Sequence, residues 1–279
     1  MHAKLGFPIA LLLAAAVVGA GAAAILTNLV AFGAPPGLQM AAPTSRAGTL
    51  EGAIAFDPPR PEDAPADLRE AVMYGHAIFT DTGGRLPEHV GNRLSCANCH
   101  FDGGRSKEGI SLVGVAAVYP KYRSRTHYAT DLVSRTNECF QRSMNGKPLA
   151  PESHEMQALV AYYQWISRGL PVYGEIPWLG LKRVDSKHAP DPEAGKTAWA
   201  EKCAVCHGGD GGGSAVGPPV WGSASFNDGA GMHREETLAA FARWNMPRGA
   251  PDLTHEQALD VAAFVAKQPR PHFTGARKM

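Results

Sequence analysis

The chain has 279 residues, with 27 Lys and Arg against 26 Asp and Glu, so its formal net charge is +1. Hydrophobic residues make up 44% of the sequence, which excludes a disordered or fibrous protein, and the balanced charge argues against nucleic-acid binding. The five cysteines are too few for a disulfide scaffold, and the length predicts one or two domains.

An uncharged apolar segment lies near the amino terminus. No Asp, Glu, Lys or Arg lies between Lys4 and Arg46, and residues 7–32 contain only two polar side chains. We expect residues 1–33 to be a signal-anchor helix that spans the inner membrane, with a cleaved signal peptide as the alternative. Either way the rest of the chain is expected in the periplasm, anchored in the first case and soluble in the second. Residues 34–65, rich in Pro and Ala, are expected to be a linker.

Helical patterns flank a cysteine motif in the first half of the remaining chain. Apolar side chains at helical spacing run from Leu68 to Phe79 and again from Met156 to Tyr163. The first of these helices carries Gly75 four residues before an aromatic side chain.

The second half repeats this order of elements. Asp191-Pro192 is typical of a helix start, and Gly195 stands four residues before Trp199. Thr254-x-x-Gln257 is a capping box ahead of the last apolar stripe. No segment shows sustained strand alternation, so we expect an all-α fold. Its two domains are expected at residues 66–175, here called the first half, and 176–279, the second half.

Each half contains one CxxCH pentapeptide, Cys96-Ala97-Asn98-Cys99-His100 and Cys203-Ala204-Val205-Cys206-His207. This pattern is typical of c-type haem attachment, because two thiols bond to the porphyrin and the adjacent His reaches the iron. A single copy is also compatible with a zinc or dithiol motif, but two copies, each flanked by the same order of predicted helices, favour haem. We therefore predict two tandem cytochrome c-type domains with two covalently bound haem c groups. The attached cysteines are Cys96, Cys99, Cys203 and Cys206, and the proximal iron ligands are His100 and His207.

The sixth ligand of the second haem is expected to be a methionine. Met246-Pro247 follows a helix predicted over residues 235–244, and Met opposite His raises a haem's reduction potential. Met232 is the alternative ligand.

Cys139 is the one cysteine outside the two motifs. It follows His100 by 39 residues, as Met246 follows His207, and it is expected in the corresponding loop. This equal spacing favours Cys139 as the sixth ligand of the first iron, with Met144 and His127 as alternatives. A thiolate ligand lowers the reduction potential of a haem, so electrons are expected to pass from the first haem to the second. A small buried hydrophobe is the purely structural interpretation of Cys139.

The segment around Cys139 is basic. Six cationic side chains lie between residues 119 and 147 against two acidic ones, Asp131 and Glu138. Such a cluster is compatible with a solvated face, with haem propionates or with a small anion, and the sequence favours the anion. The six are Lys121, Arg123, Arg125, Arg135, Arg142 and Lys147.

Four segments resemble the dihaem thiosulfate dehydrogenases that form tetrathionate, and the resemblance covers about residues 66–270. These segments are Arg135–Gly146, Gly217–Gly222, Ser225–Met232 and Asn245–Pro247. The resemblance implies oxidative coupling of two thiosulfates at a His/Cys-ligated first haem. It implies that electrons then pass through a His/Met-ligated second haem to a c-type cytochrome or a membrane oxidase.

The resemblance also implies roles for individual residues. Arg125 and Arg135 would hold the sulfonate oxygens, Ser143 would line the same pocket, and Cys139 would bond transiently to substrate sulfur. Asn245 stands where some members carry a Lys able to exchange onto the second iron, so no such exchange is expected here. The alternative function is a membrane-tethered dihaem electron-transfer cytochrome without its own substrate, and a third is oxidation of another sulfur anion.

Overall fold

The structure is a computed structural model that describes residues 54–123 and 127–275. All described residues belong to one compact unit that begins at Ile54. The predicted membrane helix, most of the predicted linker and Arg125 lie outside the described residues. Among the described residues, no helix has both the length and the apolar character needed to cross a membrane.

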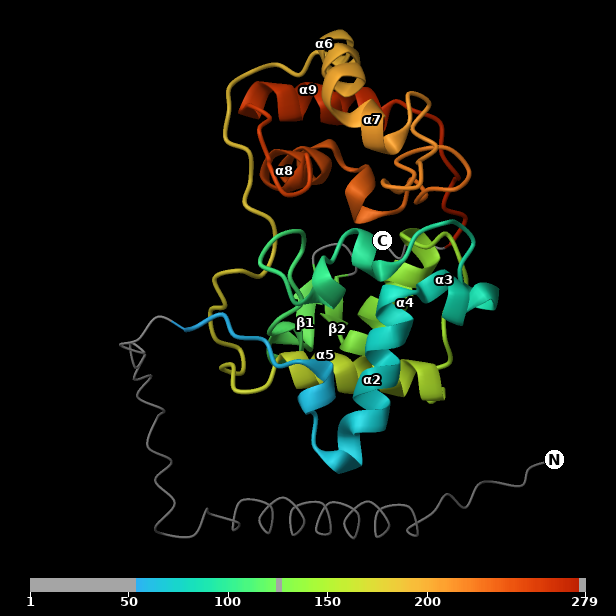
Figure 1. Cartoon of the computed structure of the whole chain (residues 1–279), viewed down its shortest axis with the longest axis vertical. Coiled ribbons are helices and arrows are strands. Elements are labelled where there is room, and N and C mark those ends of the chain that lie inside the picture. Colours follow the sequence, from blue (N-terminus) through green and yellow to red (C-terminus); the bar gives the residue numbers. More distant parts are fainter. Residues whose placement is uncertain (1–53, 124–126, 276–279) are drawn as a thin grey trace, which may run out of the picture. The chain divides into compact units, whose positions relative to one another are not determined.

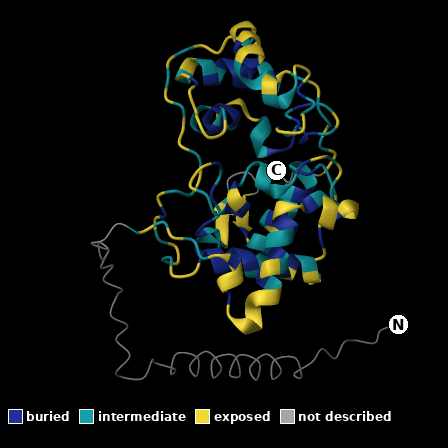
Figure 2. Cartoon of the chain, in the orientation of Figure 1, coloured by how far each residue is buried: buried dark blue, intermediate teal, exposed yellow. Residues whose placement is uncertain are grey.

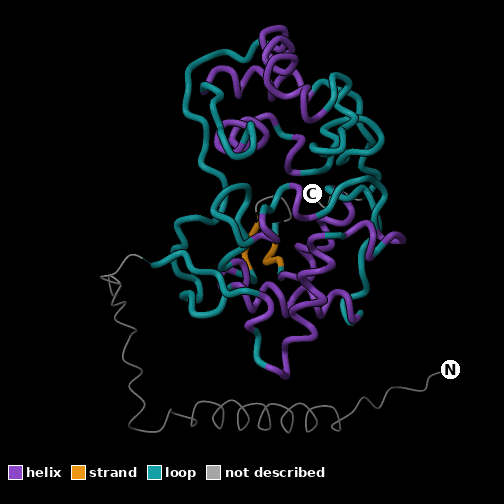
Figure 3. Tube along the Cα trace, viewed as in Figure 1, coloured by secondary structure: helices purple, strands orange, loops and turns teal. Residues whose placement is uncertain are grey.

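The described part of the chain is mostly helical, and long loops connect the helices (Figures 1 and 3). Helices of the first half are α2 (Ala66–Thr80), α3 (Thr82–Arg85), α4 (Leu132–Arg142) and α5 (His154–Ile166). Helices of the second half are α6 (Pro192–Ala198), α7 (Ala204–His207), α8 (Glu235–Asn245) and α9 (His255–Ala266). The predicted helical architecture is confirmed at this level.

A glycine allows the two main helices of the first half to pack closely. A Cβ atom at Gly75 of α2 would lie 2.1 Å from the carbonyl oxygen of Ala158 on α5, so only glycine fits. The apolar faces of these helices are buried, with Phe79 and Leu159 almost inaccessible (Figure 2).

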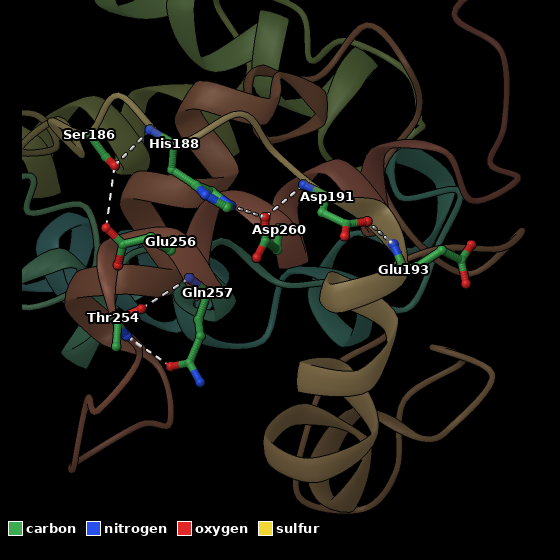
Figure 4. Close-up of polar contacts among 8 residues, drawn as sticks. All are labelled: Ser186, His188, Asp191, Glu193, Thr254, Glu256, Gln257 and Asp260. Carbon is green, nitrogen blue, oxygen red and sulfur yellow. Dashed lines mark hydrogen bonds and ion pairs between the residues drawn. The ribbon is translucent and has the colours of Figure 1, made fainter.

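The second half uses the same contact between α6 and α9. A Cβ atom at Gly195 would lie 2.0 Å from the carbonyl oxygen of Asp260. The predicted helix starts are also present, since Asp191 accepts from the Glu193 N–H and Thr254 forms its reciprocal capping box with Gln257. Figure 4 shows both caps.

Asp260 ties the segment before α6 to α9. Its buried carboxylate accepts from the backbone N–H of Asp191 at 2.7 Å and lies 2.6 Å from His188 Nε2 (Figure 4). The connection between the halves is thus fastened to the second half at its end.

A two-stranded antiparallel sheet departs from the all-α expectation. β1 (Lys121–Arg123) pairs with β2 (Tyr128–Thr130), with Lys121 opposite Thr130. Each strand has three residues, which is too short to produce a visible alternation of apolar and polar side chains. The sheet carries basic side chains and leads directly into α4.

Candidate functional site

The first CxxCH motif is held in a short 3-10 turn over Cys96–Asn98. The Cys96 N–H donates to Thr82 Oγ1 at 3.1 Å, and the Ser95 N–H donates to Asn98 Oδ1 at 2.7 Å. His100 Nδ1 lies 2.6 Å from the carbonyl oxygen of Ile110, so Nδ1 carries the proton and Nε2 keeps its lone pair. Burial lowers the pKa of His100 to about 4, which keeps the imidazole in the neutral form that binds metals.

The cavity beside this motif has the size and composition of a haem pocket. It has a volume of about 700 Å³ and is lined by the motif, by apolar side chains such as Phe79, and by Cys139. Burial raises the pKa of both motif thiols, Cys96 and Cys99, to about 12, so they are protonated in the free chain. These residues fit a covalently attached haem with His100 below the iron.

The second CxxCH motif lies where a π-helical turn, Trp199–Cys203, leads into α7. His207 Nδ1 lies 2.8 Å from the Pro218 carbonyl oxygen, which orients this ring as Ile110 orients His100. A second cavity of about 240 Å³ is lined by Cys203, Cys206 and His207, and it also fits a haem.

The two candidate distal residues face these cavities from different local structures. Met246 is the C-cap of α8 and lines the second cavity. Cys139 lies in the last turn of α4, and not in the loop predicted from the sequence. Asp131 caps the N-terminus of this helix. The equal spacing from the two histidines therefore does not reflect equal local structure.

The alternative ligands have different positions. Met144 is buried and lines the same cavity as Cys139, whereas His127 is exposed and is absent from the lining. Met232 lines both haem cavities, so it lies where the two halves meet.

Cys139 has a cationic neighbour on its own helix. Arg135 Nη1 lies 2.9 Å from Cys139 Sγ, one helical turn away. The cysteine sulfur is the main cause of a raised Arg135 pKa, so the arginine stays charged and stabilises negative charge on that sulfur. Glu138 lies 3.3 Å from Arg123 and 3.8 Å from Arg135, which fixes both guanidinium groups at this wall.

A third cavity, of about 560 Å³, opens next to Cys139 and contains an excess of cationic side chains. We call it the anion cleft. Both halves line it, and Ser143 and Glu138 belong to its wall. Its arginines are Arg123, Arg135, Arg142, Arg183 and Arg234.

The sequence predicted only part of the anion cleft. Arg135 and Ser143 lie together with Cys139 as expected, while Arg125 lies outside the described residues. Arg183 and Arg234 come from the second half and were missed, because no local pattern shows that they face α4.

Both cytochrome regions match known domain families. Residues 88–172 match the family described as SoxA/TsdA, cytochrome c domain, and residues 192–269 match cytochrome c. The chain therefore contains two cytochrome c domains that carry two c-type haems.

Characterised relatives match most of the chain. The thiosulfate dehydrogenase of Stutzerimonas stutzeri is 42% identical over 236 residues, which covers 82% of this chain and 77% of the relative. The thiosulfate dehydrogenase of Allochromatium vinosum is 38% identical, with coverage of 74% and 80%.

A solved structure is also similar. The thiosulfate dehydrogenase TsdBA of Marichromatium purpuratum matches with a TM-score of 0.71 and 34% identity over 76% of this chain. This chain covers 48% of that solved chain, so it spans about half its length.

Proposed function

The chain belongs to the thiosulfate dehydrogenase family, and we propose that it joins two thiosulfate ions into tetrathionate at Cys139. The observation that carries this proposal is the shared position of Cys139, which lines both the first haem cavity and the anion cleft beside Arg135. A sulfur anion in the cleft has access to the cysteine sulfur, and electrons have a short path to a haem.

We assign His100 and Cys139 to the first haem and His207 and Met246 to the second. The presence of each pair in the lining of one cavity supports this assignment. When bound, the haems supply two one-electron acceptors, the second at the higher potential because of its thioether ligand. The catalytic half then corresponds to residues 66–175, and the half through which electrons leave corresponds to residues 176–279.

Cys139 changes its bonding partner twice in the proposed reaction. Its thiolate sulfur would bond to the terminal sulfur of one thiosulfate, and the two bound haems would take up the two electrons that this bond formation releases. The terminal sulfur of a second thiosulfate attacks the substrate sulfur of that bond, as in thiol–disulfide exchange. Tetrathionate forms and Cys139 leaves as a thiolate, so atoms and charge balance without a proton transfer.

The arginines of the anion cleft bind and orient the substrate. Arg135 serves both partners, since it stabilises the Cys139 thiolate and lies in the wall where sulfonate oxygens would bind. Ser143 lies in the same wall, and the family resemblance implies that Arg125 also binds the sulfonate oxygens. Because a thiosulfate dianion must approach first a thiolate and then a bound thiosulfonate anion, several cations are needed to offset the repulsion.

The cellular setting remains part of the proposal. We propose a periplasmic enzyme, held at the inner membrane if residues 1–33 remain attached. A c-type cytochrome or a membrane oxidase would take the electrons from the second haem.

Incubation of the dihaem protein with thiosulfate and ferricyanide tests the function. We expect tetrathionate and reduced ferricyanide in a ratio of one to two. If thiosulfate reduces neither haem and yields no tetrathionate, the proposal is wrong and an electron carrier without its own substrate is the better description.

A further inference from the structure

Asn245 makes a contact that the mechanism above does not use. It is the last residue of α8, directly before Met246, and it is 4% exposed. Its Oδ1 accepts a hydrogen bond from the backbone N–H of Gly109 at 2.5 Å, and its Nδ2 donates to the Phe241 carbonyl at 3.0 Å. The buried amide of the second half is therefore bonded to the first half.

Gly109 belongs to the loop that orients the first proximal histidine. The next residue, Ile110, accepts the His100 Nδ1 hydrogen bond and donates its own N–H to the Cys99 carbonyl at 3.0 Å. Gly109 has φ +73, and a Cβ atom there would lie 2.8 Å from the Cys99 oxygen. Gly109 thus has a backbone conformation that side-chain-bearing residues rarely adopt. The hydrogen bond to Asn245 holds this loop from the second half.

Aromatic packing surrounds the same contact. Phe101, one residue beyond the first motif, packs edge-on against Phe241 of α8 with ring centroids 5.8 Å apart. Phe101 and Cys99 also line the second cavity. In a packed region of this kind the hydrogen bond to Asn245 has little freedom to lengthen.

We propose that Asn245 is a positioning residue that couples the two haem sites. It ties the Met246 loop to the Ile110 carbonyl that holds His100, and so it sets both reduction potentials. The inference rests on the ligation proposed above. A strong hydrogen bond from Nδ1 makes an imidazole a better electron donor to iron, which lowers the potential, and a fixed thioether keeps the second potential high.

The coupling predicts opposite shifts when Asn245 loses its amide. In the dihaem Asn245→Leu variant, the Ile110 loop relaxes and the potential of the first haem rises. Met246 becomes less well held, so the potential of the second haem falls. The near-infrared charge-transfer band of iron–thioether ligation weakens. Spectroelectrochemical titration of both haems and the absorption spectrum measure these changes.

Two further variants separate positioning from general loosening. Asn227→Leu removes another buried amide between the halves, which donates at 2.9 Å to the carbonyl of Gln141, in the α4 turn that carries Cys139. It forms no hydrogen bond with the Met246 or Ile110 loops, so it can affect the first haem alone. We expect no opposed shifts in this variant. Asn245→Asp keeps an oxygen that accepts from Gly109, and we expect it to retain the thioether band.

Each outcome bears on a defined claim. If the wild-type protein shows the thioether band and Asn245→Leu leaves both potentials unchanged, the coupling is wrong while the ligation stands. The coupling is also wrong if Asn227→Leu shifts the two haem potentials in opposite directions as much as Asn245→Leu does. If the wild-type protein lacks the band, the proposed ligation itself fails and the inference fails with it.

Discussion

The two halves have the same framework and differ in the element that carries the proposed distal residue. In the first half this element is the last turn of α4, where Cys139 lies against Arg135 and beside an open cationic cleft. In the second half it is the C-cap of α8, and the cavity of about 240 Å³ is much smaller than the first, at about 700 Å³. This difference supports the proposal that the first half binds the anion and the second half passes the electrons on.

The largest expected effect comes from making the first site resemble the second. Cys139→Met keeps a sulfur ligand but removes the nucleophile, so we expect tetrathionate formation to fall by about 10³-fold or more. The potential of the first haem should rise towards that of the second. Ferricyanide-coupled turnover and a redox titration measure both effects.

Met144→Leu is the matched control for Cys139→Met, because Met144 lines the same cavity. It should retain the low-temperature EPR signature of thiolate-ligated haem. Near-normal turnover in Cys139→Met would contradict the proposed reaction. A wild-type protein whose first haem lacks the thiolate signature and shows thioether ligation that Met144→Leu abolishes would transfer the ligand role to Met144.

Removal of one cation from the cleft should have a smaller effect. Arg135→Gln deprives the Cys139 sulfur of its nearest positive charge, and we expect kcat/KM for thiosulfate to fall by about 10²-fold. Arg85→Gln removes an exposed arginine of α3 that does not line the cleft and should leave turnover unchanged. Equal losses in the two variants would mean that net charge matters and the position of Arg135 does not.

The shared framework itself can be tested by stability. Gly75→Ala and Gly195→Ala each force a Cβ atom into the backbone of the opposing helix, so each should cost about 1–3 kcal/mol of unfolding free energy. Gly209→Ala is the control, since a Cβ atom there meets nothing within 4 Å. Denaturant titrations measure the differences, and a neutral Gly195→Ala would show that the halves pack differently.

Local patterns in the sequence predicted most of the framework. The caps at Asp191 and Thr254 depend on neighbouring residues, which a sequence displays directly. For Gly75 and Gly195 the sequence showed only their places in the helices, and the helices that they contact lie far along the chain. Cys139 was predicted to lie with Arg135 and Ser143, and it does, although on a helix.

Contacts between the halves could not be predicted in the same way. Arg234 reaches the anion cleft and Asn245 reaches Gly109 only because distant segments pack together. No periodicity encodes such a pairing, since each partner is locally an ordinary polar or small residue. The three-residue strands were missed for a different reason, because they are shorter than one detectable period.

The smallest expected effect concerns acid sensitivity. Buried histidines of both halves contribute, since burial also lowers the pKa of His233 in the second half. Burial lowers the pKa of His76 in the first half below its ordinary 6.5. In the second half, burial opposes ionisation of Asp228, but hydrogen bonds from the Phe273 N–H and from His272 outweigh it and hold the pKa below 3.8. Both groups bind protons more readily in the unfolded chain than in the folded one. The stability that each contributes is therefore lost as the pH falls below the group's ordinary pKa.

The two contributions should therefore disappear in different pH ranges. Between about pH 7.5 and pH 5 the wild-type protein should lose less than about 1 kcal/mol through His76, since that side chain is only partly buried. His76→Gln should flatten this slope, whereas Asp228→Asn should keep it and differ from the wild type only near and above pH 4, where the carboxylate is ionised. Denaturant midpoints measured across this range test the assignment. A slope that His76→Gln leaves intact would mean that another histidine, such as His233 of the second half, controls the acid sensitivity.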